Sequence, residues 1–252
     1  MLSYFKKTEQ IWTWLPKLQA HRGYWASGFS QNSLASIQAA FDIGFEMAEF
    51  DIRLTLDQKI ILFHDDCLQN KPIEQMSFEE INRITSVNTL NEVFQWLQDL
   101  NSLKFKLNIE IKSHRVLDSR LEKQLCDLIS QYRLDASVLV SSFNPFSLYK
   151  LRLQNSKIYR ALLYTTENHP KNKWYLTRMI FNYLAAPHLL HVDFKCWPQV
   201  QKIKKHWNIP VVLWTVNDLQ IARSYLNQNH PREVMSIITD TVTPYALAPQ
   251  TN

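Results

Sequence analysis

Acids and a histidine mark the ends of one apolar stretch, EFDIRLTLDQKIILFHD, at residues 49–65. Glu49 and Asp51 stand two residues apart, so a strand would point both side chains toward the same face. Burying a carboxylate without a partner is costly, which means that these acids need a cation nearby. His64 closes the stretch, and histidine is the side chain that titrates nearest neutral pH. The stretch therefore predicts a metal site with an acid/base group beside it.

Ionisable residues stand at the ends of other apolar runs as well. His21 and Arg22 close LQAHR, while Glu110 and Lys112 repeat the two-residue spacing in LNIEIK. Three carboxylates offer the oxygen ligands that suit a hard divalent cation, Mg²⁺ or Ca²⁺. Arg22 and Lys112 would balance an anionic group on a substrate, and a guanidinium has the fork that fits phosphate. His21 would then pair with His64 as general acid and base.

The elements that must position these residues are short apolar runs that alternate with segments of helical period. The candidate strands are LQAHR, MAEFDIRL, IILFH, LNIEIK, SVLVSSF, IYRALLY, LLHVDF, VVLWTV and SIITD. Residues 32–44, 89–100, 119–133 and 218–227 carry apolar residues three and four apart, which predicts helices. With IILFH taken as an extension of the second strand, about eight parallel βαβ units fit the chain. That count predicts a single (β/α)8 barrel, with the active site at the carboxyl ends of its strands.

Length and glycine content separate this fold from a doubly wound open sheet. A chain of 252 residues with 46% hydrophobic and 20% charged residues suits one globular domain with a full core. An open sheet would bind a nucleotide through a glycine-rich turn, but the chain has only three glycines and no G-x-G-x-x-G or P-loop. We therefore expect one barrel domain over residues 18–252, with residues 1–17 as an N-terminal segment that packs on it.

Composition limits the partners and the compartment that the sequence predicts. The net charge of +5 is compatible with an anionic ligand such as a phosphate ester or with an anionic lipid surface. The basic residues are spread along the chain and form no compact run or nucleic-acid motif, so we expect no nucleic-acid partner. Three well-separated cysteines, with no signal peptide or membrane-spanning run, predict a cytoplasmic protein. Residues 3–15 and 171–184 mix basic and aromatic side chains, so a peripheral membrane contact is one interpretation. We favour the other, outer helices with lysines lying along their surface. The oligomeric state is not predicted.

The order of the motifs resembles that of the glycerophosphodiester phosphodiesterase family, whose barrel is of the type found in phosphatidylinositol-specific phospholipases C. The resemblance runs from residue 21 to about residue 244 and is strong as a set, although each motif alone is weak. The family's motifs stand here as His21-Arg22-Gly23, Gln31-Asn32-Ser33 in altered form, Glu49-Phe50-Asp51, Thr55-Leu56-Asp57, His64-Asp65, Glu110-Ile111-Lys112, Ser142-Phe143, Trp214-Thr215-Val216-Asn217 and Thr239-Asp240.

The resemblance implies an enzyme that hydrolyses glycerophosphodiesters to glycerol 3-phosphate and an alcohol. It implies a divalent metal, Mg²⁺ or Ca²⁺, held by Glu49, Asp51 and Glu110. His21 and His64 would exchange protons with the attacking hydroxyl and the leaving alcohol. The substrate would be bound by Arg22, Lys112 and Trp214, of which the first two would hold the phosphate.

Departures from the family pattern leave the substrate open. Gln31 replaces the usual acid, and Gln58 and Ser236 stand where glycine is usual. A lysophospholipase D-like or phospholipase C-like lipid hydrolase is therefore one alternative, and a barrel that binds phosphodiesters without turnover is another. Three simpler interpretations also stay open at this point. The two cations would merely pair with the acids, Trp214 would belong to the core, and Asp65 would orient a neighbour or cap a turn.

Overall fold

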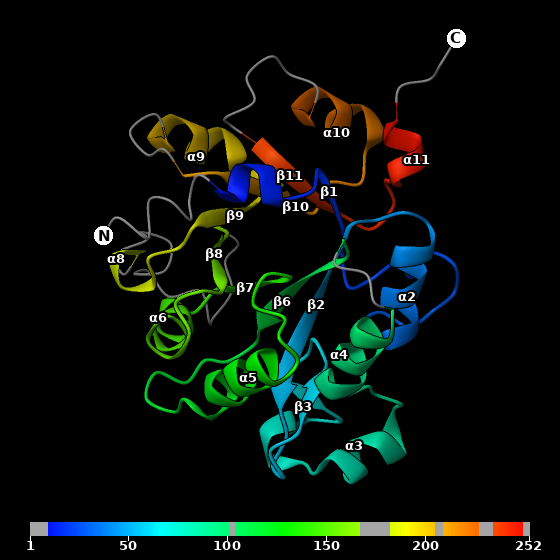
Figure 1. Cartoon of the computed structure of the whole chain (residues 1–252), viewed down its shortest axis with the longest axis vertical. Helices are drawn as coiled ribbons and strands as arrows, with labels where there is room; N and C mark the ends of the chain where they lie inside the picture. Colours follow the sequence, from blue (N-terminus) through cyan, green and yellow to red (C-terminus); the bar gives the residue numbers. More distant parts are fainter. Residues whose placement is uncertain (1–9, 101–103, 167–181, 205–208, 227–233, 249–252) are drawn as a thin grey trace.

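Eight parallel strands close into a barrel within the residues that this computed structural model describes, which are 10–100, 104–166, 182–204, 209–226 and 234–248. The order around the barrel is β1, β2, β6, β7, β8, β9, β10 and β11, and β11 pairs with β1 to close it (Figure 1). The strands are β1 (Leu18–Ala20), β2 (Met47–Leu54), β6 (Lys106–Ile111), β7 (Val138–Ser142), β8 (Tyr159–Tyr164), β9 (Leu189–Asp193), β10 (Val211–Trp214) and β11 (Val234–Thr239). The predicted (β/α)8 barrel is confirmed.

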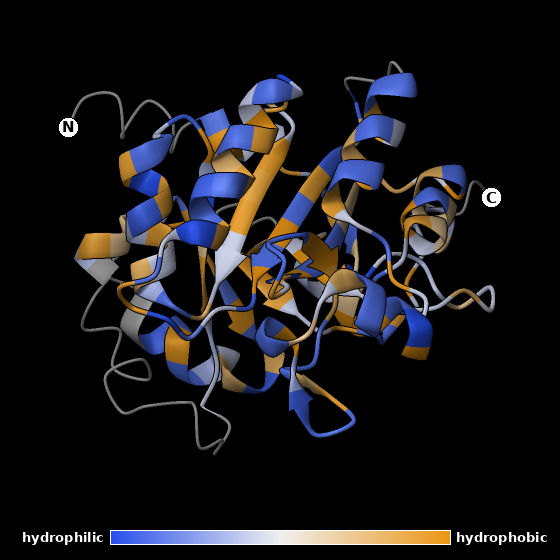
Figure 2. Ribbon diagram, turned by 90° about the horizontal axis from the view of Figure 1, so that it is seen from below, coloured by the Kyte–Doolittle hydropathy of each residue, from blue (hydrophilic) through white to orange (hydrophobic). Residues whose placement is uncertain are grey.

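Helices between the strands form the outer layer. They are α2 (Leu34–Asp42), α4 (Leu90–Asp99), α5 (Arg120–Gln131), α6 (Pro145–Gln154), α8 (Asn182–Ala185), α9 (Trp197–Lys204), α10 (Leu219–Leu226) and α11 (Pro244–Leu247). The four segments predicted from apolar spacing are α2, α4, α5 and α10. Ser33, Thr89 and Asn144 begin α2, α4 and α6, because each side-chain oxygen accepts a hydrogen bond from a backbone N–H of the first turn. Figure 2 shows hydrophobic strands surrounded by helices striped with hydrophilic and hydrophobic residues.

The chain between β2 and α4 departs from the simple strand–helix repeat. Strand β3 (Ile60–Leu62) folds back antiparallel on the end of β2, so the expectation that it lengthens the second strand is wrong. After it come β4 (Cys67–Leu68), β5 (Lys71–Pro72), a 3₁₀ turn at Ile73–Gln75 and α3 (Phe78–Ile84). Ile61, Ile73, Met76 and Ile81 form a small core of their own under this insertion. His64 therefore reaches the barrel from a hairpin and not from a barrel strand.

The inside of the barrel is filled by side chains, part of them polar. Gln19 of β1 donates to Ser236 Oγ of β11 at 3.0 Å and accepts from the Asn108 side chain of β6 at 2.9 Å. Ser141 of β7 donates to the Asn108 side-chain oxygen at 3.0 Å. All four residues are buried, and buried polar groups are tolerable when they are hydrogen-bonded to one another. This chain of hydrogen bonds fixes the relative position of the strands beneath the site.

The N-terminal segment covers the opposite end of the barrel. Residues 10–14 form a helical turn, and Ile11 and Leu15 pack on a cluster of inward-facing strand residues: Met47, Leu139, Tyr159, Ala161, Leu189, Val212 and Ile238. Trp14 donates from its indole nitrogen to the Ala136 carbonyl at 2.7 Å, just before β7. The apolar floor is thereby shielded from water. Residues 1–9 of the predicted N-terminal segment lie outside the described residues.

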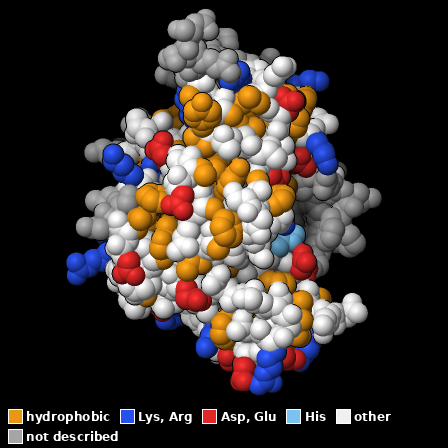
Figure 3. All heavy atoms as spheres, turned by 90° about the vertical axis from the view of Figure 1, so that its right-hand side faces the viewer, with side chains coloured by type: hydrophobic (Ala, Val, Ile, Leu, Met, Phe, Trp, Pro, Cys, Tyr) orange, Lys and Arg blue, Asp and Glu red, His pale blue; other side chains and the backbone are white. Residues whose placement is uncertain are grey.

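The outer surface of the described residues mixes charged, polar and hydrophobic side chains. Among the described residues, no helix combines the length and the apolar character that crossing a membrane requires. Figure 3 shows acidic and basic side chains mixed on one face and gathered at its lower end, where Figure 1 places α3. Lys71 pairs there with Glu80 at 2.7 Å, and Arg83 pairs with Glu79. These ion pairs add little stability because water screens them, but within each pair the opposite charges cancel.

The turn from β1 into α2 depends on a glycine. Gly23 has a φ of +75°, and its N–H donates to the Glu49 carbonyl at 3.0 Å, which brings the turn onto β2. A Cβ at this position would lie 2.4 Å from Ser36 Oγ and 2.6 Å from the Ser36 carbonyl carbon. Only glycine fits, because both the backbone conformation and the contact with α2 exclude a side chain.

We predict that Gly23→Ala lowers the free energy of unfolding by about 3 kcal/mol, since strain from positive φ and a steric clash add. Gly44→Ala is the matched control: its φ of +91° brings the same strain, but no atom lies within 4 Å of the added Cβ. The control should lose about 1 kcal/mol. Urea unfolding followed by circular dichroism measures both, and equal losses would contradict the steric argument.

Candidate active site

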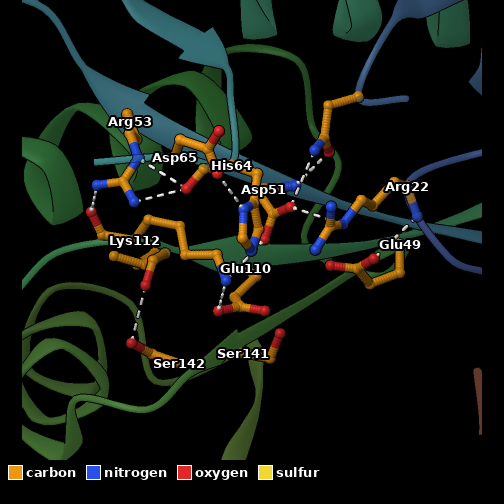
Figure 4. Close-up of polar contacts among 12 residues, drawn as sticks. Arg22, Glu49, Asp51, Arg53, His64, Asp65, Glu110, Lys112, Ser141 and Ser142 are labelled. Carbon is orange, nitrogen blue, oxygen red and sulfur yellow. Dashed lines mark hydrogen bonds and ion pairs between the residues drawn. The ribbon is translucent and has the colours of Figure 1, made fainter. Parts of the chain in front are cut away.

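Three carboxylates converge at the carboxyl end of the barrel. Glu49 and Asp51 lie on β2 with their side chains on the same face, and Glu110 of β6 stands opposite Asp51 in the strand register. One oxygen of each carboxylate lies within 4.8 Å of the others, and all three residues are buried (Figure 4). The strand register therefore brings the predicted ligand set together in space.

The electrostatics of this triad call for a cation. Burial, followed by the neighbouring charge of Asp51, raises the pKa of Glu49 to about 8. Burial also raises the pKa of Glu110, although the nearby Lys112 ammonium acts against it. Burial acts to raise the pKa of Asp51, but the charges of its cationic neighbours, Lys112 first, and the Asn32 hydrogen bond together outweigh it, so the pKa falls below its ordinary value. Because Glu49 still favours its protonated form, a further positive charge would stabilise the cluster. All the donor atoms are oxygens, which fit a hard divalent ion.

Lys112 and Arg22 contact the acids directly. The Lys112 ammonium lies 2.6 Å from Glu110 Oε1 and 3.1 Å from Asp51 Oδ1, and Arg22 Nε lies 3.5 Å from Asp51 Oδ2. Arg22 Nη1 donates to Gln31 Oε1 at 2.9 Å. The residue that replaces the family's acid thus still accepts a hydrogen bond from the cation. Both cations stand where the simpler interpretation put them, paired with the carboxylates.

Each candidate proton-transfer histidine is held by an aspartate. His21 Nδ1 lies 2.7 Å from Asp240 Oδ1, and His64 Nδ1 lies 2.7 Å from Asp65 Oδ1. An ionised aspartate only accepts hydrogen bonds, so these contacts place a proton on Nδ1. Nε2 of each ring is left to exchange protons, and that of His21 lies 4.0 Å from Glu49 Oε2. Asp65 therefore orients its neighbour, one of the two roles left open by the sequence.

The pKa values of the two histidines are shifted in opposite directions. Burial acts to lower the pKa of His21, but the Asp240 hydrogen bond and the Glu49 charge outweigh it, so the pKa is raised. Burial lowers the pKa of His64, and the Lys112 charge lowers it further, more than Asp51 and Asp65 restore. When the surroundings shift the pKa values of two groups in opposite directions, one group suits the role of general acid and the other that of general base.

Trp214 ends β10 and meets Phe143 of the β7 end across the mouth. Their ring centroids are 5.7 Å apart at 82°, an edge-to-face contact between strands that are not neighbours. The Lys112 ammonium lies 5.9 Å from the Phe143 centroid. The Trp214 indole nitrogen is buried and has no acceptor among the described residues. Two aromatic rings, one of them with an indole N–H that has no acceptor among the described residues, therefore lie beside the Lys112 ammonium.

Sequence reasoning assigned no role to several residues that support the site. Asn32 donates to Asp51 Oδ2 at 2.9 Å and accepts from the Asp51 N–H at 2.8 Å. Asn217 donates to Asp240 Oδ2 at 2.8 Å and accepts from the Asp240 N–H at 2.8 Å. Both asparagines and Asp240 fall inside the quoted motifs, which is the signal that could have found them. Arg53 falls outside every motif.

The two departures at glycine positions have local explanations. Gln58 adopts a φ of +61°, the left-handed conformation that glycine favours, at a cost of about 1 kcal/mol. Its N–H donates to the Thr55 carbonyl at 3.0 Å, which closes the turn. Ser236 is buried and accepts the hydrogen bond from Gln19, so its hydroxyl is satisfied inside the barrel. Neither departure disturbs the acidic triad.

The fold and the site define an enzyme of the (β/α)8 barrel class, with its reactive groups at the carboxyl ends of the strands. The chain belongs to the glycerophosphoryl diester phosphodiesterase family, whose model matches residues 21–243. It is 30% identical over 233 residues to an uncharacterized protein of Mycoplasma genitalium, covering 84% of this chain and 91% of that protein. It is 26% identical over 215 residues to a glycerophosphodiester phosphodiesterase of Caldanaerobacter subterraneus, covering 79% and 84%.

Solved structures share the fold. A phosphodiesterase of Oleispira antarctica, solved in complex with the product sn-glycerol-3-phosphate, has a TM-score of 0.72 at 23% identity, covering 91% of this chain and 94% of that one. A glycerophosphodiester phosphodiesterase of Parabacteroides distasonis has a TM-score of 0.71 at 23% identity, covering 89% and 92%. Both likenesses support the barrel architecture over nearly the whole chain.

Because the Glu49 pKa is raised to about 8, we predict that Mg²⁺ or Ca²⁺ binding releases a proton at pH 7. A metal ligand must be deprotonated, so the affinity should rise with pH and level off above about 8. Titration calorimetry in two buffers of different protonation enthalpy counts the proton. Glu49→Gln, which carries no titrating proton, should bind more weakly and release none. Proton release that persists in this variant would assign the proton to another group.

Proposed function

We propose that the protein hydrolyses glycerophosphodiesters to glycerol 3-phosphate and an alcohol, with Mg²⁺ or Ca²⁺ held by Glu49, Asp51 and Glu110. The observation that carries the proposal is the convergence of these buried carboxylates beside two histidines held by aspartates. Membership of the family supports the substrate class. The glycerol 3-phosphate bound to the Oleispira phosphodiesterase of the same fold supports it further.

The two histidines divide the proton transfers. His64, whose pKa is lowered, acts as general base: it takes the proton of the attacking hydroxyl while that oxygen bonds to phosphorus, and water supplies the oxygen in the net hydrolysis. His21, whose pKa is raised, gives a proton to the leaving alcohol as general acid. The metal, when bound, polarises a phosphoryl oxygen and lowers the pKa of a bound hydroxyl or water.

Arg22, Lys112 and Trp214 bind the substrate in this proposal. The charges of Arg22 and Lys112, now paired with the acids, would become available to the phosphate if Glu49, Asp51 and Glu110 held a divalent cation. The forked guanidinium of Arg22 matches phosphate oxygens, while the Lys112 ammonium acts as a point charge. Trp214 and its partner Phe143 pack against the glycerol or the head group. The indole N–H of Trp214, which has no acceptor among the described residues, would donate a hydrogen bond to a hydroxyl of the substrate.

A lipid substrate is the second candidate, and one surface feature favours it. Val116 and Leu117, in the loop that follows β6 at the mouth of the barrel, are 46% and 95% exposed. These two apolar side chains would offer a contact for the acyl chain of a lysophospholipid. A lysophospholipase D-like or phospholipase C-like activity would then replace or accompany hydrolysis of water-soluble diesters.

The test is release of glycerol 3-phosphate from glycerophosphocholine and glycerophosphoethanolamine, with Mg²⁺, with Ca²⁺ and with EDTA. We predict metal-dependent release that EDTA abolishes, because the triad supplies the metal ligands. Release from lysophospholipids alone would favour the lipid candidate. Binding of glycerophosphocholine without release of any product would favour a barrel that binds phosphodiesters without turnover, and would overturn the proposal.

We predict that His21→Ala and His64→Ala each lower kcat by about 10²–10⁴-fold, because each removes a proton-transfer group. Lys123→Ala is the control: this lysine lies on α5, its side chain is 68% exposed, and it pairs with Asp127 at 2.7 Å. Its loss should leave kcat close to that of the parent. Circular dichroism should be unchanged in all three variants. Near-normal turnover in either of the first two would remove that histidine from the reaction.

A further inference from the structure

Arg53 stands two residues beyond Asp51 on β2, on the face of the strand that carries the acidic triad. Its side chain is only 11% exposed, although arginine is ordinarily a surface residue. Figure 4 shows its guanidinium between the main chains of His64 and Lys112. A buried arginine in this place needs an explanation from its contacts.

The guanidinium joins three separate segments. Its Nε and Nη2 both donate to the His64 carbonyl, at 3.1 Å and 2.6 Å, and its Nη1 donates to the Lys112 carbonyl at 3.2 Å. Nη2 also lies 2.6 Å from Asp66 Oδ1, which balances the charge. All three nitrogens therefore have acceptors within the protein. Arg53 is not placed to bind the substrate itself.

Both carbonyls belong to residues that lie just beyond the end of a strand. β3 ends at Leu62, and the Phe63 N–H still donates to the Asp51 carbonyl of β2 at 3.0 Å, so the His64 carbonyl lies one residue beyond this backbone pairing. Lys112 follows the last residue of β6, Ile111. The guanidinium fork ties these two chain ends to each other and to β2.

Only arginine can make this set of contacts. Its planar guanidinium carries donors in a rigid fork, whereas a lysine ammonium is a single point at the end of a flexible chain. A lysine at this position would keep the charge near Asp51 and Glu110 but would not hold both carbonyls at once. Replacing arginine by lysine thus separates the effect of charge from the effect of position.

We propose that Arg53 is a positioning residue of the reaction, which fixes the His64 imidazole relative to Lys112 across the acidic triad. The inference rests on the proposed function, since His64 and Lys112 have their roles there. A misplacement of about 1 Å in a reacting group can cost about 10²-fold in rate. Loss of the fork should therefore lower kcat strongly and leave KM nearly unchanged.

The experiment compares Arg53→Lys and Arg53→Met with the parent, using metal-dependent release of glycerol 3-phosphate from glycerophosphocholine. Both variants should lower kcat by about 10²-fold. Arg115→Met is the matched control, because that arginine is half-exposed, pairs with Glu74 at 2.7 Å and touches none of the site residues. Wild-type kcat in Arg53→Lys would overturn the inference, since charge alone would then suffice.

A double-mutant cycle with His64→Ala tests whether Arg53 acts through His64. On that background Arg53→Met should cost little further kcat, because the group that it positions is already gone. A residue with a merely structural role would lower kcat by the same factor on both backgrounds, and that result would overturn the inference. Should Arg53→Met not fold, Arg53→Lys enters the same cycle with the same expected result.

Hydrogen exchange of the backbone amides at residues 63–66 gives a readout that does not depend on turnover. Exchange there should quicken in Arg53→Met and Arg53→Lys but not in Arg115→Met, while the barrel strands stay protected. Unchanged exchange would overturn the inference whether or not the protein is active. A parent without turnover on any diester would instead overturn the proposed function, so the two failures are distinguishable.

Discussion

Three carboxylates buried within 4.8 Å of one another are the constraint on which the rest of the site depends. Their mutual repulsion and their loss of water must be offset by positive charge and hydrogen bonds. Lys112 and Arg22 supply the charge in direct contact, and Asn32 holds one of the acids by two hydrogen bonds. The barrel supplies the rigidity, because the β2–β6 register and the hydrogen-bonded interior set where the acids stand.

Burial and neighbouring charges also give the two site histidines different pKa values. His21 follows the last residue of β1 and is less exposed than His64; it lies beside Asp240 and the charge of Glu49 and favours its protonated form. His64 lies nearer the solvent and close to the Lys112 ammonium, and favours its neutral form. The difference comes from position in the fold, since each ring has an aspartate at the same distance.

Much of the barrel could be predicted from sequence because its signals are local. The alternation of apolar runs with segments of helical period holds for α2, α4, α5 and α10, and the spacing of Glu49 and Asp51 sets their common face. The direction of β3 could not be predicted, since a short apolar run fits either a longer strand or a hairpin. The contact of His21 with Asp240 joins residues 219 apart in sequence, so it needs the closed barrel. Arg53 gave no signal because its partners are backbone carbonyls, which any sequence offers.

The antiparallel hairpin that carries His64 makes the reactive centre a composite of two structural units. The acids and His21 belong to the barrel, whereas His64 belongs to the insertion between β2 and α4, which has its own small core. The length and composition of that insertion can diverge among relatives without rebuilding the barrel. Such a division keeps the hairpin histidine and the acidic triad in separate units, so that a change in the hairpin can leave the positions of the three carboxylates unaltered.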